Sequence, residues 1–210
     1  MSHVIVFQGD SITDVGRSRD EAVPANEGMG AGYPFLVSSY LRCHEPAKNW
    51  QVFNRGISGN RVVDLYARWK IDALNLKPDI LSILIGVNDT WHEFARSNGV
   101  EVPRYEKIYR MLLEWTREVL PKVHLVLLEP YVQASEIVTG AWIAEMDQRR
   151  AIVKRLAEEF DALFIPTQSL LDAALKKAPS NYWLRDGVHP TSAGHQLIAE
   201  AWLKATKSLR

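Results

Sequence analysis

The sequence predicts an α/β protein in which a parallel sheet carries helices on both of its faces. Two observations support this fold class. Short apolar segments alternate along the chain with longer segments whose apolar residues recur at helical spacing, and this alternation is typical of a parallel sheet flanked by helices. In addition, the segment "DILSILIG" at residues 79–86 is apolar toward both sides, as a central parallel strand is.

Five short apolar segments are expected to form the strands of this sheet. Pro130 and Pro166 end the fourth and the fifth segment, because proline cannot continue the hydrogen bonds of a strand. The expected strands are residues 3–8, 50–54, 79–86, 124–130 and 162–166.

The longer segments between and after these strands are expected to form helices. In one of them Val62, Leu65, Trp69 and Ala73 recur at helical spacing before Pro78 ends the segment. The expected helices are residues 33–42, 62–73, 105–120, 143–160, 168–177 and 192–209.

Length and composition indicate one globular domain over residues 1–210. A chain of 210 residues suits one domain better than two and can bury a core without a disulfide or a metal. Apolar residues make up 47% and charged residues 24% of the chain, which is ordinary for a soluble protein. Basic and acidic residues balance at 25 each, so charge gives no reason to expect a nucleic-acid or membrane partner.

The compartment is expected to be the cytoplasm. The first residues, "MSHVIVFQGDS", lack the long apolar segment and the cleavage site of a signal peptide, and no apolar run approaches membrane-spanning length. Cys43 is the only cysteine, so no internal disulfide can form, which is compatible with a reducing compartment.

Four polar stretches are expected to meet at one edge of the sheet. "GDSIT" (9–13), "NRGISGN" (54–60) and "IGVND" (85–89) each follow a predicted strand, and "DGVHP" (186–190) precedes the last predicted helix. The carboxyl ends of parallel strands lie at the same edge, where ligands of such folds bind. The sequence therefore predicts a functional site there.

The residues in these stretches fit the requirements of acyl transfer. Ser11 supplies a hydroxyl nucleophile at a sharp turn, and His189 is a candidate base. Asp186 precedes His189 by three residues, close enough for its carboxylate to hold the Nδ1–H of the imidazole and leave Nε2 to take the proton of Ser11.

Three groups are candidates for the oxyanion hole, which must donate hydrogen bonds to the oxygen of the reacting carbonyl. Gly59 could bring its backbone N–H close to the reacting carbon because no side chain blocks the approach. Asn88 offers a side-chain amide, and the Ser11 N–H is a third donor.

The four stretches together resemble the SGNH hydrolases, also called the GDSL-like esterase family. The four residues that name the family match Ser11, Gly59, Asn88 and His189, with the acid at Asp186. The resemblance covers the whole chain and implies a flavodoxin-like, three-layer α/β/α sandwich with a five-stranded parallel sheet. It also implies hydrolysis of esters through an acyl-serine, with no metal and no cofactor. The motif reads Gly-Asp-Ser-Ile in place of Gly-Asp-Ser-Leu, an exchange of one apolar side chain.

Longer stretches, such as "NRGISGNRVVDLYARW" and "DGVHPTSAGH", are similar to carbohydrate acetyl esterases of the acetylxylan esterase type. This narrower resemblance implies removal of acetyl groups from a small-molecule or oligosaccharide ester, and it leaves assembly into a homo-oligomer open.

Taken singly, most of these residues also have a structural interpretation. Ser11 could cap a helix, and Asn88 could belong to an ordinary turn. Asp10 is expected to have a structural hydrogen-bonding role. Trp91 and Trp183 lie near the motifs, where they could stack on a sugar or pack in the core. The Gly-rich segment 14–32 could form a rim or lid over the site.

Three other functions remain open at this stage. The same machinery with a longer acyl pocket would give a thioesterase or lysophospholipase. A metal-dependent phosphoesterase could use Asp10, Asp89, Asp186 and His189, since carboxylates at strand ends bind divalent ions. A non-catalytic sugar-binding module would account for the tryptophans but not for the serine, aspartate and histidine.

Overall fold

The computed structural model describes residues 3–210 and contains, within that range, one sheet of five parallel strands. The strand order is β2-β1-β3-β4-β5, so the chain reverses direction across the sheet after β2. Each strand is registered directly on its neighbours, with Phe7 of β1 opposite Asn54 of β2 and Ser82 of β3. The strands are β1 (Val4–Gly9), β2 (Gln51–Asn54), β3 (Ile80–Leu84), β4 (His124–Leu128) and β5 (Leu163–Ile165).

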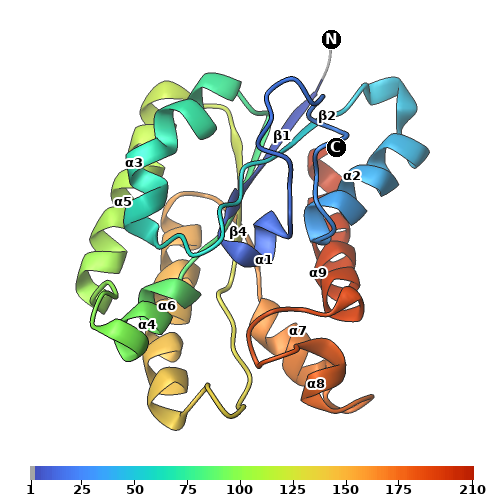
Figure 1. Cartoon of the computed structure of the whole chain (residues 1–210). Coiled ribbons are helices and arrows are strands. Elements are labelled where there is room, and N and C mark those ends of the chain that lie inside the picture. The colour runs from blue at the N-terminus through green and yellow to red at the C-terminus, as the bar shows by residue number, and fades with distance from the viewer. Residues whose placement is uncertain (1–2) are drawn as a thin grey trace.

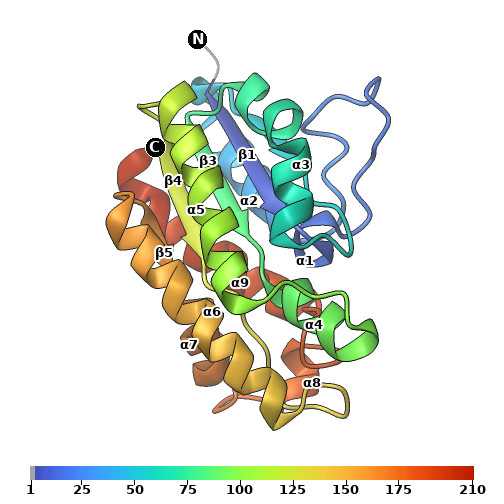
Figure 2. The ribbon, with the colours of Figure 1, turned by 90° about the vertical axis from the view of Figure 1, so that its left-hand side faces the viewer.

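Helices cover both faces of the sheet, so the predicted α/β/α fold class is confirmed (Figure 1). The first face carries α2 (Tyr33–His44), α7 (Thr167–Ala174) and α9 (Ser192–Ala205). The opposite face carries α3 (Val62–Asp72), α5 (Val102–Val119) and α6 (Gly140–Glu159), which lie toward the viewer in Figure 2.

Two apolar cores lie between the sheet and these helices. Successive residues of a strand point to opposite faces, so Ile5 and Phe7 enter one core while Val6 enters the other. The indole N–H of Trp202 donates to Ser82 Oγ at 3.0 Å across the first core. Such bonds remove the cost of burying an indole N–H without an acceptor.

Three short elements lie at the carboxyl ends of the strands and were not predicted. They are α1 (Ser11–Asp14), α4 (Val87–Arg96) and α8 (Ser180–Trp183). The alternative interpretation, in which Asn88 belongs to an ordinary loop turn, is wrong, because this residue lies near the start of helix α4. The predicted strand 79–86 also ends earlier, at Leu84, since Gly86 has a φ of 140° and breaks the extended backbone. Several other predicted bounds shift by a few residues. Helix α5 begins at Val102 and α6 at Gly140, α7 ends at Ala174, and the last helix ends at Ala205 and continues as a 3₁₀ turn.

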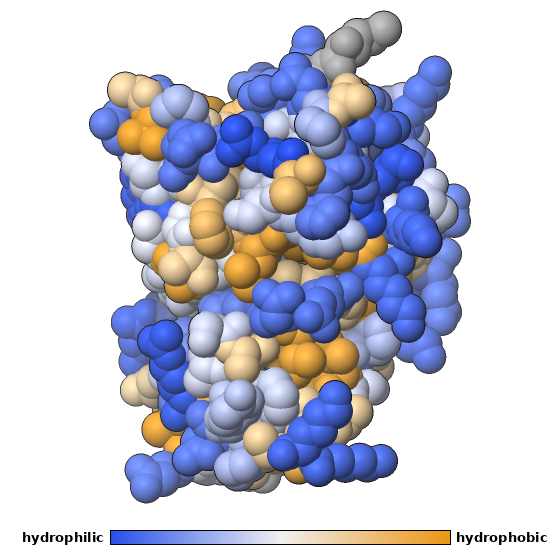
Figure 3. Space-filling view, turned by 90° about the vertical axis from the view of Figure 1, so that its right-hand side faces the viewer, coloured by the Kyte–Doolittle hydropathy of each residue, from blue (hydrophilic) through white to orange (hydrophobic). Residues whose placement is uncertain are grey.

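The outer surface over α2 and α9 is mainly hydrophilic, with apolar atoms gathered in bands between the polar ones (Figure 3). Phe35 and Tyr40 of α2 are each 44% exposed. No helix within residues 3–210 has both the length and the apolar character needed to span a bilayer.

The segment between α1 and α2 lies along the edge strand β2. Its residues form a cavity of about 510 Å³ together with Phe53 of β2 and Arg55 just after that strand. None of the four motif residues Ser11, Gly59, Asn88 and His189 lines this cavity. In the structure this segment packs against the edge of the sheet. The lid that segment 14–32 is expected to form over the site therefore stays a prediction.

Candidate active site

Ser11 lies at an abrupt transition from strand to helix. Strand β1 ends at Gly9, and α1 begins at Ser11. A Cβ atom on Gly9 would lie 2.3 Å from Thr13 Oγ1 and 2.5 Å from the Leu84 carbonyl oxygen, so only glycine fits there. The cap of this helix is Asp10, whose Oδ1 accepts the Ile12 N–H at 3.0 Å. Ser11 is therefore not the cap, and its hydroxyl is available for another role.

The structure brings Ser11, His189 and Asp186 together in one hydrogen-bonded relay. Ser11 Oγ lies 2.9 Å from His189 Nε2, although the two residues are 178 positions apart. His189 Nδ1 lies 2.7 Å from Asp186 Oδ2. A carboxylate accepts and does not donate, so this contact requires the proton on Nδ1 and leaves a lone pair on Nε2 directed at the serine hydroxyl.

The loop that carries Asp186 and His189 is held by its own backbone. Asp186 Oδ1 accepts the N–H groups of Val188 at 3.0 Å and His189 at 2.8 Å, which fixes the carboxylate relative to the ring. Gly187 has a φ of 86°, and a Cβ there would lie 2.3 Å from the Gln133 carbonyl oxygen. The carboxylate of Asp186 can therefore reach the ring of His189, three residues later, because the backbone between them turns at Gly187.

Asp186 is ionised in this arrangement. Burial alone would raise the pKa of Asp186, but hydrogen bonds from the backbone and ring of His189 and from the Val188 N–H outweigh it and lower the pKa. A charged carboxylate at Nδ1 stabilises the imidazolium that forms when the ring accepts a proton.

The three candidate oxyanion donors are the N–H groups of Ser11 and Gly59 and the side-chain amide of Asn88. Within residues 3–210, neither the Ser11 N–H nor the Gly59 N–H donates to a protein acceptor. Asn88 Nδ2 donates to the Asn60 carbonyl at 3.1 Å, which orients the amide and leaves its second N–H free.

Gly59 has a backbone conformation that favours glycine. Its φ is 82°, in the left-handed region that favours glycine, while a Cβ there would have nothing within 4 Å. This conformation favours glycine at position 59, and the approach of its N–H to the reacting carbon stays a prediction. Asn60, whose carbonyl holds Asn88, was not identified from the sequence, although it lies in the same motif stretch.

Asp10 and Asp89 are buried structural carboxyl groups. Asp89 accepts the Val62 N–H at 3.0 Å and so joins the start of α3 to α4. Burial raises the pKa of each of the two aspartates to about 7. Asp10 Oδ1 caps α1, while its Oδ2 is buried with no hydrogen-bond partner in the described part of the chain. The predicted hydrogen-bonding role of Asp10 agrees with this geometry.

The two tryptophans near the motifs differ in position. The ring of Trp91 lies 5.6 Å from that of His189 and 5.4 Å from that of Trp142, and Trp91 is partly exposed. Trp183 is buried in the core with its indole N–H donating to the Ala178 carbonyl at 3.1 Å. Trp183 therefore packs in the core, and only Trp91 borders the relay.

The described part of the chain, residues 3–210, contains no cluster of three or more His, Cys, Asp or Glu side chains placed to hold a metal ion. The ligand geometry on which the phosphoesterase alternative depends is thus absent from those residues.

Comparisons with known proteins point to one family. The sequence profile of the GDSL-like Lipase/Acylhydrolase family matches residues 7–197. An acetylxylan esterase from Geobacillus stearothermophilus is 37% identical over 205 residues, which cover 95% of this chain and 92% of the relative.

Solved structures give the same picture. A candidate GDSL-like lipase from Parabacteroides merdae superimposes with a TM-score of 0.94 at 44% identity, covering 100% of this chain and 97% of the other. A catalytic mutant of Axe2, an acetylxylan esterase from Geobacillus stearothermophilus, superimposes with a TM-score of 0.88 at 35% identity, covering 98% and 95% of the two chains.

Proposed function

Because the chain belongs to the GDSL-like lipase/acylhydrolase family and is a carboxylic ester hydrolase, we propose that it removes acetyl groups from carbohydrates with Ser11 as nucleophile. The observation that carries this proposal is the relay in which Ser11 Oγ, His189 and Asp186 are joined at 2.9 and 2.7 Å. A serine hydroxyl is a weak nucleophile at neutral pH, and a base at hydrogen-bond distance is what activates it.

The first half of the reaction forms an acyl-enzyme. Ser11 Oγ attacks the ester carbonyl carbon while its proton passes to His189 Nε2, and the carbonyl oxygen becomes an oxyanion. The N–H groups of Ser11 and Gly59 and the free amide N–H of Asn88 stabilise that charge. One such donor contributes about 3 kcal/mol to the transition state. Collapse of the intermediate breaks the bond to the sugar oxygen, which takes the proton from His189.

The second half releases the acid. A water molecule gives a proton to His189 Nε2 and attacks the acyl carbon, which again forms an oxyanion held by the same donors. Breaking the bond to Ser11 Oγ returns the proton to the serine and frees acetate. These steps use only groups of the chain and water.

The choice of an acetylated carbohydrate rests on two observations. The relative described as an acetylxylan esterase is similar over nearly the whole of both chains. In addition, Trp91 presents a partly exposed aromatic ring beside His189, where the leaving group departs. Aromatic faces beside a hydrolytic centre suit the apolar face of a sugar ring.

The first test is the variant Ser11→Ala assayed on 4-nitrophenyl acetate. Loss of the nucleophile is expected to lower kcat by about 10⁶-fold. The matched control is Ser39→Ala, which removes an exposed serine of α2 and should leave kcat unchanged. Full activity in Ser11→Ala at an unchanged melting temperature would refute the mechanism.

A substrate panel tests the acyl and sugar preference. Acetylated xylo-oligosaccharides, acetylated monosaccharides and 4-nitrophenyl esters of graded chain length are compared by kcat/KM. The proposal predicts the highest values for acetate esters of sugars. A preference for octanoate over acetate would instead favour the thioesterase or lysophospholipase alternative.

A further inference from the structure

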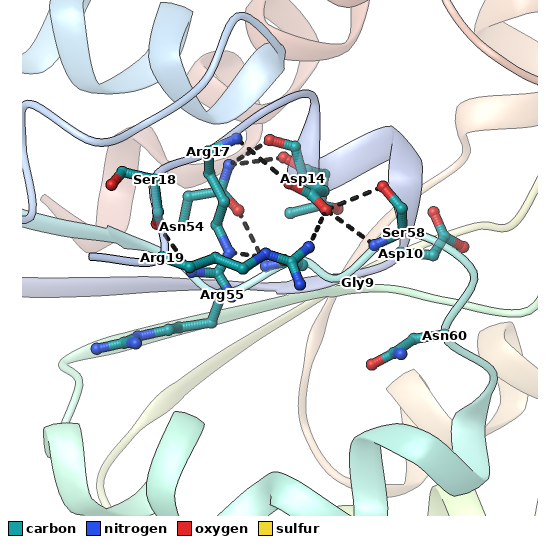
Figure 4. Close-up of polar contacts among 12 residues, drawn as sticks. Gly9, Asp10, Asp14, Arg17, Ser18, Arg19, Asn54, Arg55, Ser58 and Asn60 are labelled. Atoms are coloured by element: carbon teal, nitrogen blue, oxygen red, sulfur yellow. Dashed lines mark hydrogen bonds and ion pairs between the residues drawn. The ribbon is translucent and has the colours of Figure 1, made fainter. Parts of the chain in front are cut away.

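The carboxylate of Asp14 lies between the helix that carries Ser11 and the loop that carries Gly59 (Figure 4). Asp14 is the last residue of α1, three positions after Ser11, and its side chain is only 5% exposed. Oδ2 accepts two hydrogen bonds from Ser58, one from its backbone N–H and one from its hydroxyl, each at 2.9 Å. Ser58 directly precedes Gly59 in the chain.

These two bonds fix the backbone just before the candidate oxyanion donor. The Ile57 N–H donates to the Gly9 carbonyl at 3.1 Å, and the Asn60 N–H donates back to the Ile57 carbonyl at 3.1 Å, which closes a tight turn. The N–H of Gly59 lies within this turn and has no acceptor among residues 3–210. Asp14 therefore holds the Ile57–Ser58 peptide and the Ser58 hydroxyl, and within residues 3–210 it is the only side chain of α1 that hydrogen-bonds to Ser58.

Two arginines lie beside this carboxylate and its loop. Arg19 Nη2 donates to Asp14 Oδ2 at 2.8 Å (Figure 4). Arg17 Nε donates to the Gly56 carbonyl at 2.6 Å. Burial would raise the pKa of Asp14, but the bonds from Ser58 and the charges of Arg19 and Arg17 lower it. Hydrogen bonds to an ionised acceptor are about twice as strong as those between neutral groups.

From this geometry we infer that Asp14 is a positioning residue for the oxyanion hole: it fixes the Gly59 N–H relative to Ser11 by clamping Ser58. The inference rests on the proposed function, in which Gly59 donates to the oxyanion. A hydrogen-bond donor stabilises the transition state fully only when it lies within about 0.5 Å of the productive geometry, and a misplacement of about 1 Å can lower the rate 10²-fold. The loss falls on the transition state, so kcat decreases while KM stays nearly constant.

The test compares Asp14→Ala, Asp14→Asn, Ser58→Ala and the double variant Asp14→Ala/Ser58→Ala on 4-nitrophenyl acetate. Asp14→Ala is expected to lower kcat by about 10²-fold, with KM within twofold. Asp14→Asn keeps one acceptor oxygen and loses the charge, so its effect is intermediate. Ser58→Ala loses one of two bonds and lowers kcat less than tenfold. The double variant should be no worse than Asp14→Ala, because the serine hydroxyl acts through the carboxylate.

The control variant is Asp79→Asn. Its Oδ2 also accepts a backbone N–H, that of Val4 at 2.8 Å, but at the amino-terminal edge of the sheet, away from the site. This variant is expected to change the melting temperature alone. Hydrogen exchange followed by mass spectrometry gives a readout without turnover: the peptide over residues 55–61 should exchange faster in Asp14→Ala than in wild type and in Asp79→Asn.

Two outcomes overturn the inference. One is a kcat within twofold of wild type in folded Asp14→Ala or, if that variant does not fold, in Asp14→Asn. The other is unchanged exchange in the 55–61 peptide. A wild-type protein that hydrolyses none of the esters would instead refute the proposed function, and the exchange measurement would still decide whether Asp14 holds the loop.

Discussion

Replacing Asp186 by asparagine tests the hydrogen bond that determines which ring nitrogen of His189 carries the proton. The amide oxygen of Asn keeps the position of Oδ1, which accepts the N–H groups of Val188 and His189, so the loop keeps its shape. The amide nitrogen takes the position of Oδ2, 2.7 Å from His189 Nδ1. Two donors cannot face one another at that distance, so the ring proton moves to Nε2. The nitrogen that faces Ser11 then carries a hydrogen and cannot accept another.

The size of the effect follows from the contacts that are lost. To accept the Ser11 proton, the ring must return its own proton to Nδ1. That tautomer has lost a hydrogen bond to a charged acceptor, which contributes about 1.5–3 kcal/mol, and it places a donor against the amide donor, which costs about a further 1–3 kcal/mol. The sum of about 2.5–6 kcal/mol corresponds to a decrease in rate of about 10²- to 10⁴-fold. The Asp186 side chain is 34% exposed, so water relieves part of the mismatch. We therefore expect a decrease of about 10²- to 10³-fold in kcat.

The assay is kcat and KM on 4-nitrophenyl acetate, with the melting temperature as a check on folding. The control is Asp172→Asn, an exposed carboxylate of α7 whose partner is the Gln168 side chain. It should leave kcat unchanged. A kcat for Asp186→Asn within threefold of wild type would show that Asp186 does not determine which nitrogen of His189 is protonated. Asp186 would then no longer be assigned as the acid that orients the histidine.

Three further predictions concern single groups. Asn88→Ala should lower kcat about 10²- to 10³-fold with little change in KM, measured on the same ester, since it removes one oxyanion donor. Burial raises the pKa of Asp10 from 3.8 to about 7, so the folded state keeps a proton that the unfolded state releases between those pH values, and the stability from this group falls as pH rises across them. Asp10→Asn should therefore gain stability relative to wild type over that interval, by up to about 1.4 kcal/mol per pH unit in urea unfolding, and a pH-independent difference would contradict the assignment. Ser82→Ala leaves the buried Trp202 indole N–H without its acceptor and should lower the free energy of unfolding by about 1–3 kcal/mol, whereas an unchanged urea midpoint would show that the bond contributes nothing.

The sheet could be predicted from the sequence because apolar patterning is a local signal. Each strand is a short apolar run between longer amphipathic segments, and all five predicted strands are present. The helix α4 escaped prediction because its first turn contains Asn88 and Asp89, residues that favour turns on local grounds. Their side chains are engaged far along the chain, with Asn60 and Val62, and those contacts favour the helix start.

The site was partly predictable for the same reason. The spacing of Asp186 and His189 is a local signal, and their contact at 2.7 Å agrees with it. Ser11 was ambiguous by itself, because a cap and a nucleophile present the same residue type after a strand. Asp14 could not be found from the sequence, since its partner Ser58 lies 44 positions away and neither residue has a distinctive local pattern.

The relay joins the first strand of the chain to a loop that leads into its last helix. Helix α9 packs against α2, so the base reaches Ser11 only after the carboxyl-terminal part of the chain has docked. A refolding intermediate with a formed sheet but an undocked α9 would be compact and inactive. The rate at which esterase activity returns after dilution from denaturant would therefore report the docking of α9. Circular dichroism would report the return of secondary structure separately.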